Sequence, residues 1–415
     1  MAASIERPRP STRAARVSER EWFEHWGAVA IVVLVAVRYR FSPDIPIAFL
    51  VSVALIPVTF RQLPRHRWAL PIVGLTVIAA ASGILISALR TDVVQINQSL
   101  QIVQSVRVLS VGVVLACLLW ARAVIGTRRL VFYFGLGSLM SLGVTGMNAD
   151  NIWKFSLSVP VILFVLALPW VWQRRGRQLV ALGALAAISA VADSRSLAAI
   201  LVIVMTITLF ERRAEPDERR SRRGVVAIAR LALVALAGYF IVQAAILDGM
   251  LGQAARARTE MQIERSGNVI VGGRPEMGAA LALITERPLG YGSGVLVTYD
   301  ERNNGKSGMR SIGYDPDNGY VDNYMFGYGH EVHSVLGDLW LHFGLAGAVL
   351  AFLVLIAVMH GAGHGIVSGT IPAAALFLAV RTLWDFGLSP FASSMLYLPL
   401  ALAVILPLRA RAPDG

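Results

Sequence analysis

The sequence predicts an all-α fold made of about 12 transmembrane helices. Of the 415 residues, 56% are hydrophobic and only 15% are charged, whereas ordinary soluble domains have roughly 25% charged residues. Because each membrane span uses about 20 mostly apolar residues, this composition leaves little for a soluble domain and excludes a water-soluble globule. The single cysteine, Cys117, also excludes an internal disulfide framework and any cysteine-based zinc site.

Twelve apolar runs of span length follow one another along the chain. The first nine, within 22–247, lie near 22–37, 45–60, 68–89, 106–121, 130–147, 155–172, 178–192, 195–210 and 225–247. The last three, within 334–408, lie near 334–359, 366–384 and 391–408. The first run also has the length of a signal-peptide core, but Ala36-Val37-Arg38 follows it in place of a cleavage site, so we interpret it as an uncleaved span.

The distribution of Lys and Arg sets an orientation for these runs. With the N-terminus in the cytoplasm, the tails 1–21 and 409–415 and the joints on the same side hold 22 Lys and Arg, whereas the short outer joints and nearby helix ends hold seven. Because cytoplasmic loops are enriched in Lys and Arg, this bias predicts that both termini are cytoplasmic. The net charge of +12 is then a topology signal, since the cytoplasmic segments carry +13 and the rest −1, which excludes nucleic acid as a partner.

One long polar segment, 248–333, separates the ninth and tenth runs and faces the outside in this orientation. Loops of this length are usually functional or disordered. This one is rich in Gly, Asp, Asn and Tyr between Tyr314 and Tyr328, and its apolar stretch Ala279 to Ile284 predicts a helix lying on the membrane surface. We therefore expect the functional residues to concentrate in this segment.

Two local patterns in this segment suggest other sites but lack the required spacing. Gly305-Lys306-Ser307 resembles the end of a phosphate-binding P-loop, but Asp300 stands where the first glycine belongs. His330 and His333 are three residues apart, whereas zinc-protease helices use His-Glu-x-x-His, with the histidines four apart. The sequence therefore predicts no nucleotide site, no metal and no cofactor.

Three segments carry polar residues in a spacing that an ordinary loop does not require. The first begins with Gly272-Gly273-Arg274-Pro275 and ends with Pro288-Leu289-Gly290-Tyr291-Gly292-Ser293-Gly294. The second begins with His330-Glu331-Val332-His333-Ser334 and has glycines 11 and 14 residues after His333, at Gly344 and Gly347. The third, Asp193-Ser194-Arg195-Ser196, directly precedes an apolar run.

These segments resemble the signature of the O-antigen ligase and O-antigen polymerase superfamily. In that family an Arg opens an amphipathic stretch that ends in Pro-Leu-x-Gly-x-Gly, a His-Asn pair opens a helix that carries two glycines, and a Ser-Arg pair starts a mid-chain span. The likeness covers roughly residues 190–350 by motif. Ser334 replaces the usual Asn and His342 stands where the family often has Glu, so the subfamily stays open.

The resemblance implies a membrane enzyme that moves a glycan from undecaprenyl diphosphate onto an acceptor hydroxyl. The reaction would take place at the outer face of the bacterial inner membrane, without nucleotide or metal. The implied partners are the lipid-linked glycan donor, a glycan, lipid or protein acceptor, and membrane lipid. A ligase and a polymerase share this donor chemistry, so the sequence leaves both open, together with the oligomeric state.

The resemblance implies catalytic roles for His333, Arg274 and Arg195. Arg meets phosphate oxygens with a planar, permanently charged fork, which suits a diphosphate leaving group. A His with a pKa near about 6.5 can take the proton of an acceptor hydroxyl. The alternatives are that His333 only binds the diphosphate or caps the following helix, and that each Arg is a solvated or interfacial side chain.

Four further residues are candidates for substrate binding: Glu331, Asp338, His330 and Arg381. Asp338 follows His333 by five residues, an offset of about 140° on a helix, so a direct pair between them is not expected. Arg381 and Asp385 are four residues apart and are expected to pair on one helix face.

The motif glycines are assigned structural roles. Gly290, Gly292 and Gly294 allow a tight turn in the loop. Gly344 and Gly347 allow close packing between helices.

Two other classes of protein fit the same composition: a polytopic secondary transporter and a non-enzymatic polysaccharide export subunit. Transporters tend to place their sites at the membrane midplane, on broken helices in related halves. Here the polar cluster lies in the outer segment and the two halves of the chain are unlike, which favours the enzyme.

Overall fold

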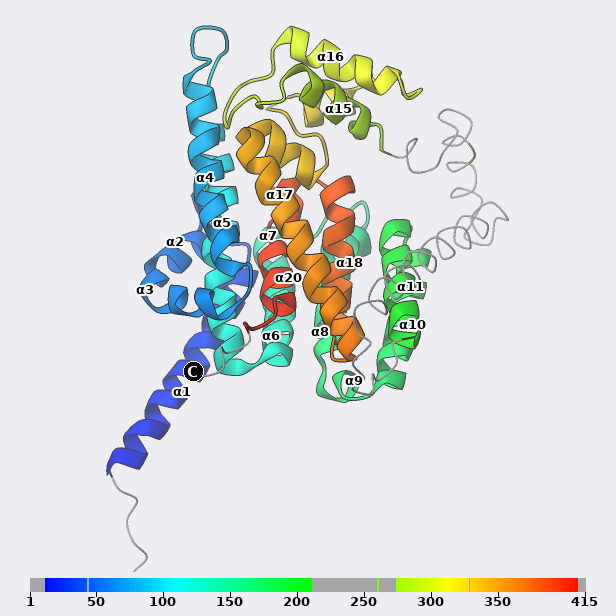
Figure 1. The fold of residues 1–415 in the computed structure, drawn as a ribbon. Helices are drawn as coiled ribbons and strands as arrows, with labels where there is room; N and C mark the ends of the chain where they lie inside the picture. Colours follow the sequence, from blue (N-terminus) through cyan, green and yellow to red (C-terminus); the bar gives the residue numbers. More distant parts are fainter. Residues whose placement is uncertain (1–11, 43–44, 211–259, 261–273, 328, 410–415) are drawn as a thin grey trace, which may run out of the picture.

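The computed structural model describes residues 12–42, 45–210, 260, 274–327 and 329–409, which are mostly helical and agree with the predicted all-α fold. The predicted ninth span near 225–247 and the first part of the segment 248–333 lie outside the described residues. Helices stand side by side in a bundle, and two further helices lie across one end of it (Figure 1). The strands of the described ranges are the short antiparallel pair β1 (Arg40–Ser42) and β2 (Ile45–Pro46).

The helices before the undescribed segment are α1 (Thr12–Ala36), α2 (Ile47–Ala54), α3 (Ile56–Thr59), η1 (Phe60–Arg65), α4 (Ala69–Ala88), α5 (Gln98–Ile125), α6 (Thr127–Met140), α7 (Leu142–Thr145), η2 (Trp153–Leu157), α8 (Ser158–Ala167), α9 (Pro169–Trp172), α10 (Arg175–Val191) and α11 (Arg195–Phe210). Those after it are α15 (Glu276–Glu286), α16 (Tyr299–Arg310), η3 (Tyr320–Met325), α17 (Val335–Ser368), α18 (Ala373–Leu388), α19 (Phe391–Ser394) and α20 (Leu398–Ile405).

Among the described helices, α4, α5 and α17 are long and apolar enough to cross a membrane. A fourth span results if α2 and the helical stretch Ile56–Arg65, which consists of α3 and η1, count as one segment. This segment is bent by 60°. The apolar helices Trp153–Ala167 and Arg195–Phe210 are shorter. These lengths and compositions fit association of the chain with a membrane.

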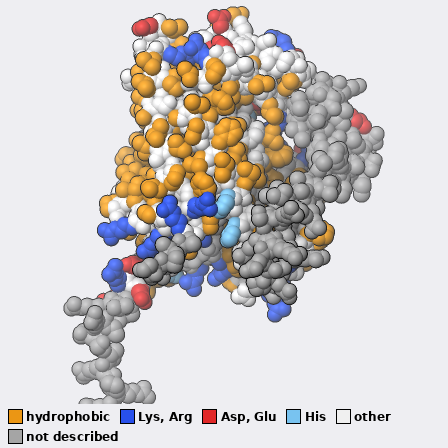
Figure 2. All heavy atoms as spheres, in the orientation of Figure 1, with side chains coloured by type: hydrophobic (Ala, Val, Ile, Leu, Met, Phe, Trp, Pro, Cys, Tyr) orange, Lys and Arg blue, Asp and Glu red, His pale blue; other side chains and the backbone are white. Residues whose placement is uncertain are grey.

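The outside of the bundle is apolar as well. Figure 2 shows a belt of hydrophobic side chains over the visible described face of the bundle, with Lys and Arg gathered toward the lower edge of this belt. On α4 alone, Leu70, Val77, Ile78 and Leu85 are each more than half exposed. Soluble proteins rarely expose a contiguous apolar surface of this extent, so the belt fits a lipid environment.

The predicted span near 130–147 is divided at Ser141, between α6 and α7. Three further predicted spans, those near 45–60, 155–172 and 391–408, are also interrupted. In each, a proline stands at the first or second position of the second helix: Pro57 in α3, Pro169 in α9 and Pro399 in α20. Proline lacks a backbone N–H and disfavours helical geometry in the residue before it. The prediction of continuous helices there is therefore wrong, because the apolar pattern ignores the prolines.

The predicted boundary between the runs 334–359 and 366–384 is also wrong. Helix α17 continues to Ser368, well past the predicted end at 359, and α18 begins only at Ala373. Gly369 adopts the left-handed conformation, with φ of 65°, that commonly closes a helix. Sequence hydropathy falls before this point because polar and small residues fill the last turns of α17.

The described residues of 274–334 form a cap layer with its own apolar core over one end of the bundle (Figure 1). Helix α15 confirms the helix predicted over the stretch Ala279 to Ile284. It crosses α16 closely, because a Cβ added at Gly278 would lie 2.4 Å from the Gly308 carbonyl oxygen. The core side chains include Leu283, Tyr291, Met309 and Phe326. The cap layer thus folds as a compact unit on the bundle.

Glycines fix the loop that leads from α15 back over the bundle. Gly290, Gly292 and Gly294 have φ of 85°, 104° and 115°, which confirms that this turn needs glycine. Gly344 has φ of 61° and interrupts the helical geometry of α17. A Cβ added there would lie 2.3 Å from the Leu289 carbonyl oxygen. Because Gly344 has no side chain, the cap-layer loop can pack closely against α17. This role goes beyond the predicted one in packing between helices.

Replacing Gly344 by Ala is expected to destabilise the protein by about 1–3 kcal/mol, because the change combines an unfavourable φ with a backbone clash. Gly363 lies in the same helix, and nothing lies within 4 Å of a Cβ added there. Gly363→Ala should therefore leave stability unchanged or raise it. Thermal unfolding of both variants in detergent tests the difference, and equal melting temperatures would contradict this account of the kink.

Candidate functional site

His333 lies in a tight turn between the cap layer and α17. Its φ of 49° is in the left-handed region that favours glycine; such a conformation costs about 1–3 kcal/mol and is typical of functional sites. The His333 ring faces the Tyr320 ring, with the centroids 5.6 Å apart. Nδ1 of His333 is buried and has no hydrogen-bond partner among the described residues. This nitrogen is therefore available to a proton or to a ligand atom.

Asp338 holds the backbone of this turn. Its side chain is buried, and one carboxylate oxygen accepts the N–H of Val332 at 2.8 Å while the other accepts the N–H of Phe391 at 2.8 Å. Both oxygens are thus used by backbone groups on either side of the site. These contacts make Asp338 a positioning residue next to His333, in place of the predicted substrate-binding group.

Two further contacts tie the ends of the turn to the bundle. Ser334 caps α17, and its hydroxyl donates to the carbonyl of Phe386, near the end of α18, at 2.8 Å. Glu331 Oε1 lies 3.6 Å from Arg107 Nη1 on α5. The turn is therefore held by α5, α17 and α18 together. Glu331 is partly exposed beside His333, so it keeps its predicted role as a candidate for substrate binding.

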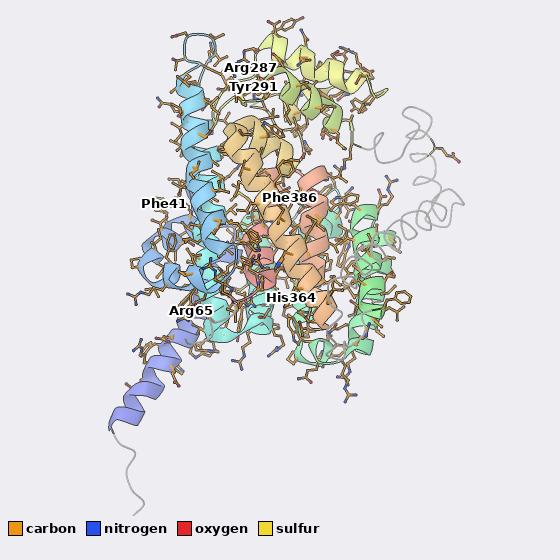
Figure 3. The ribbon with its side chains drawn as sticks, viewed as in Figure 1. Phe41, Arg65, Arg287, Tyr291, His364 and Phe386 are labelled. Carbon is orange, nitrogen blue, oxygen red and sulfur yellow. The ribbon has the colours of Figure 1, made fainter. Side chains whose placement is uncertain are left out.

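A buried ionic cluster lies directly behind the turn. Glu301 on α16 accepts a hydrogen bond from Arg90 Nη2 at 2.7 Å, and its other oxygen lies 3.3 Å from His330 Nε2. The His330 ring stacks on Tyr291 with centroids 4.3 Å apart, and Arg90 donates to the Tyr291 carbonyl at 3.0 Å. Figure 3 labels Tyr291 at the cap end of the molecule. The cluster joins the cap layer, the end of α4 and the turn.

The charge state of Glu301 follows from these contacts. Burial alone would raise the pKa of the Glu301 carboxyl, but the donors and positive charge around it, His330 first, lower it to about 2. Glu301 therefore stays ionised at neutral pH. His330 is 1% exposed and is committed to this carboxylate and to Tyr291. It is better described as a structural residue than as the predicted substrate-binding group.

Tyr320 connects His333 to the first motif. The Tyr320 hydroxyl donates a hydrogen bond to the carboxylate of Glu276, in the first turn of α15. Burial raises the pKa of the Tyr320 phenol, the Glu276 carboxylate raises it further, and the Arg274 guanidinium acts in the opposite direction. Arg274 is therefore within electrostatic range of Tyr320. The Tyr320 ring thus lies between His333 and Glu276, the residue two positions after Arg274 in the first motif.

This arrangement combines a free imidazole nitrogen, a phenol that stays protonated and a guanidinium. Such groups suit a reaction in which a hydroxyl loses its proton while an anionic group departs. Among the residues that the structure describes, no group of three or more His, Cys, Asp or Glu side chains is placed to hold a metal ion.

Arg195 is separated from the His333 turn by helix α18. It begins α11, which packs on α18, and α18 in turn packs on α17. Arg195 Nε lies 3.6 Å from Asp193 Oδ1, and Asp193 has a left-handed φ of 51°. The contacts described here therefore connect the first motif, through Glu276, with His333 but do not connect Arg195 with either of them.

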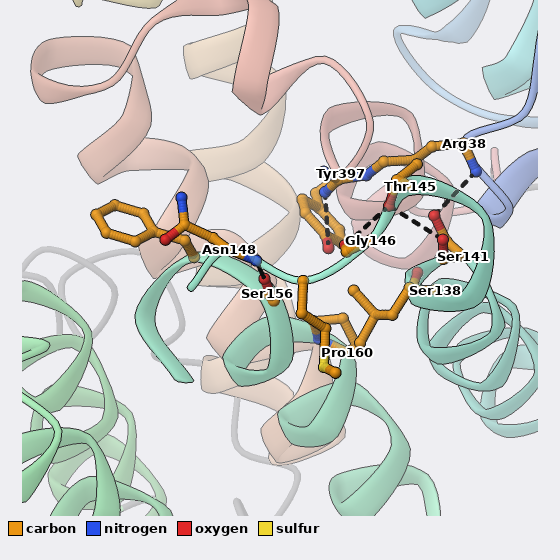
Figure 4. A pocket seen from close by; sticks show the side chains of 12 residues that line it. Arg38, Ser138, Ser141, Thr145, Gly146, Asn148, Ser156, Pro160 and Tyr397 are labelled. Carbon is orange, nitrogen blue, oxygen red and sulfur yellow. Dashed lines mark hydrogen bonds between the residues drawn. The ribbon is translucent and has the colours of Figure 1, made fainter. Parts of the chain in front are cut away.

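Arg381 is held by an ion pair and an aromatic ring. Its Nε lies 3.3 Å from Asp385 Oδ2, which confirms the predicted pair, and its guanidinium lies 5.0 Å from the centre of the Tyr397 ring. Arg38 donates to the Tyr397 hydroxyl at 3.3 Å, and both residues line a polar cavity of about 340 Å³ (Figure 4). The lining of this cavity includes no cap-layer residue. Arg381 thus contacts Tyr397, which lies in the wall of this cavity.

Sequence reasoning did not find Arg90, Glu276, Glu301 or Tyr320. Glu301 carries a readable signal, because Thr298 and Glu301 form a capping box at the start of α16. Glu276 stands inside the first motif without being singled out. For Arg90 and Tyr320 the sequence offers no local signal, since their partners are far away along the chain.

No family model, curated protein or solved structure matches the chain. The likeness to the O-antigen ligase and polymerase superfamily stays a prediction from the residues of the three motifs.

Glu301→Gln is expected to destabilise the protein at pH 7 by about 3–5 kcal/mol, because it removes one partner of a buried charge pair. The carboxyl pKa is lowered on folding from 4.5 to about 2, so its stabilising contribution is complete above pH 4.5 and is lost as the pH falls toward 2. The gap in melting temperature between wild type and variant should therefore narrow between pH 5 and pH 3.

Asp300→Asn is the matched control, because Asp300 lies in the same helical turn but is exposed. It should leave the melting temperature nearly unchanged at both pH values. A gap for Glu301→Gln that is small at pH 7, or that does not narrow on acidification, would contradict the assigned ionic cluster.

Proposed function

We propose that this protein is a membrane glycosyltransferase of the O-antigen ligase and polymerase type. It transfers a glycan from undecaprenyl diphosphate to a hydroxyl of a glycan, lipid or protein acceptor. One observation carries the proposal: His333, at the position of the family histidine, sits in a strained turn with an unpartnered ring nitrogen beside Tyr320. Other buried histidines, such as His330, also have an unpartnered ring nitrogen, but among them only His333 is held at a positive φ, and a purely structural histidine gives no reason for that strain.

In the proposed reaction, the acceptor oxygen attacks the anomeric carbon as the bond between that carbon and the diphosphate oxygen breaks. His333 takes the acceptor proton, and the diphosphate leaves with the bonding electron pair. Arg274 stabilises the negative charge that develops on the leaving group. Tyr320 remains protonated and donates to Glu276, which holds the two motifs at a fixed separation. Direct attack inverts the anomeric centre.

The proposal includes a topology of twelve spans with both termini cytoplasmic and the cap layer on the outer face of the bacterial inner membrane. The support is the bias of 22 against seven Lys and Arg along the chain and the gathering of these side chains at the lower edge of the apolar belt (Figure 2). In this orientation the cap layer meets lipid-linked donors at the membrane surface, where the acceptor is also available.

His333→Ala is expected to reduce glycan transfer by about 10²–10⁴-fold, the usual contribution of a general base. Arg274→Ala should have a comparable effect, and Arg274→Lys should restore little, because lysine keeps the charge without the bidentate fork. The measurement is the surface glycan of a deletion strain that expresses each variant, separated on a gel. Loss of long chains indicates a polymerase, whereas long chains missing only from their acceptor indicate a ligase.

Arg310→Ala is the control for this series. Arg310 lies in the cap layer on α16, and its pair with Asp317 at 2.7 Å is exposed, so its loss should change stability little. An immunoblot of the membrane fraction shows whether each variant is present. Surface glycan of unchanged length and linkage in His333→Ala and Arg274→Ala cells would overturn the proposed function.

A further inference from the structure

A basic cavity opens at the end of the bundle opposite the cap layer. It has a volume of about 750 Å³ and is lined by Gln62, Arg65, His66, Arg122, Ala123, Leu408 and Arg409. Three of these residues are Arg, one is His and none is acidic. Figure 3 labels Arg65 at this end of the molecule, far from Tyr291. The cavity is therefore strongly positive and distinct from the His333 turn.

Three separate chain segments build this cavity. Main-chain hydrogen bonds join Arg67 N–H to the Pro407 carbonyl at 3.2 Å and Arg409 N–H to the Arg65 carbonyl at 2.8 Å. From α5, Arg122 donates to the carbonyls of Ala403 and Leu406, at 2.7 and 3.0 Å, at the end of α20. The Arg122 guanidinium and the backbone at Arg65 and Arg409 are thus held around one space, and the side chains of Arg65 and Arg409 are exposed at its rim.

His66 points to the kind of ligand. Its side chain is 3% exposed, and its Nδ1 has no hydrogen-bond partner among the described residues. Burial, and then the charge of Arg122, lowers the pKa of His66 to about 4, while a hydrogen bond to the Leu406 carbonyl acts in the opposite direction. A neutral ring that donates one N–H to a carbonyl presents its other nitrogen as an acceptor. The cavity therefore offers cations together with one acceptor for a hydroxyl group.

We propose that this cavity binds the head group of an anionic phospholipid that carries free hydroxyl groups, such as phosphatidylglycerol. Arg65 and Arg409 meet the phosphate, for which guanidinium groups are well suited, and His66 accepts a hydrogen bond from a head-group hydroxyl. Leu408, in the cavity wall, is 65% exposed, so it offers an apolar side chain to the acyl chains of the lipid. Basic pockets between transmembrane helices on the cytoplasmic side are known lipid sites. This proposal does not depend on the proposed enzymatic activity.

Native mass spectrometry of the full-length protein in mild detergent tests the proposal with defined lipids. Phosphatidylglycerol should stay bound, while zwitterionic phosphatidylcholine should not. Phosphatidylethanol has the same charge without the hydroxyls and should bind about fivefold more weakly, the usual value of one hydrogen bond. Equal retention of phosphatidylglycerol and phosphatidylethanol would overturn the hydroxyl acceptor. Binding of inorganic phosphate with no retention of lipid would overturn the lipid assignment.

The double variant Arg65→Gln, Arg409→Gln should lose at least about tenfold in affinity for phosphatidylglycerol, since it removes two charge-assisted contacts. Among the described residues, Arg65 makes one side-chain hydrogen bond, an exposed one to half-buried Gln62 at 3.1 Å, so the fold should tolerate the change. The matched control is Arg61→Gln, Arg129→Gln, which removes the same charge from exposed positions in the predicted cytoplasmic joints, outside the cavity. Equal losses in both double variants would show that a diffuse charge belt holds the lipid and would overturn a defined site.

Discussion

The buried contact of Glu301 with Arg90 and His330 is the interaction on which the rest of the candidate site depends. Its three members come from the end of α4, from α16 and from the turn that leads to His333. A charge left without a partner at such a place is strongly destabilising. The three segments are therefore held in one relative position, and the cap layer is docked on the bundle in a single way.

The geometry around His333 follows from this docking and from backbone contacts on its other side. Asp338 accepts the N–H of Val332, the residue before His333. Ser334, the residue after His333, donates its hydroxyl to α18. The strain at His333 is therefore maintained by neighbours that the fold has already placed. Tyr320 and Glu276 then bring the Arg274 segment to the same ring. The unpartnered nitrogen of His333 is thus kept in a fixed orientation at the junction of a polar layer and an apolar bundle.

The sequence predicted those parts of the molecule that depend on local pattern. Apolar run length predicted α4 and α11 within about two residues, and the motif spacing placed the glycines whose positive φ shapes the loop. It failed where a proline interrupts an apolar run, and at α17, which continues past the predicted end of its span. The sequence analysis also missed the contacts around the His333 turn. Tyr320 pairs with Glu276 and Glu301 pairs with Arg90, and these partners are distant in the chain. A hydropathy pattern does not indicate such pairs.

Hydrogen exchange of the purified protein, followed by mass spectrometry, tests the central role of the ionic cluster most directly. In Arg90→Met, the account predicts faster amide exchange in α16 and in residues 329–334, while α5 and the second half of α17 stay as protected as in the wild type. Such a result would show that the cluster docks the cap layer and holds the His333 turn. Unchanged exchange in residues 329–334, or loosening of the whole chain to the same extent, would contradict it.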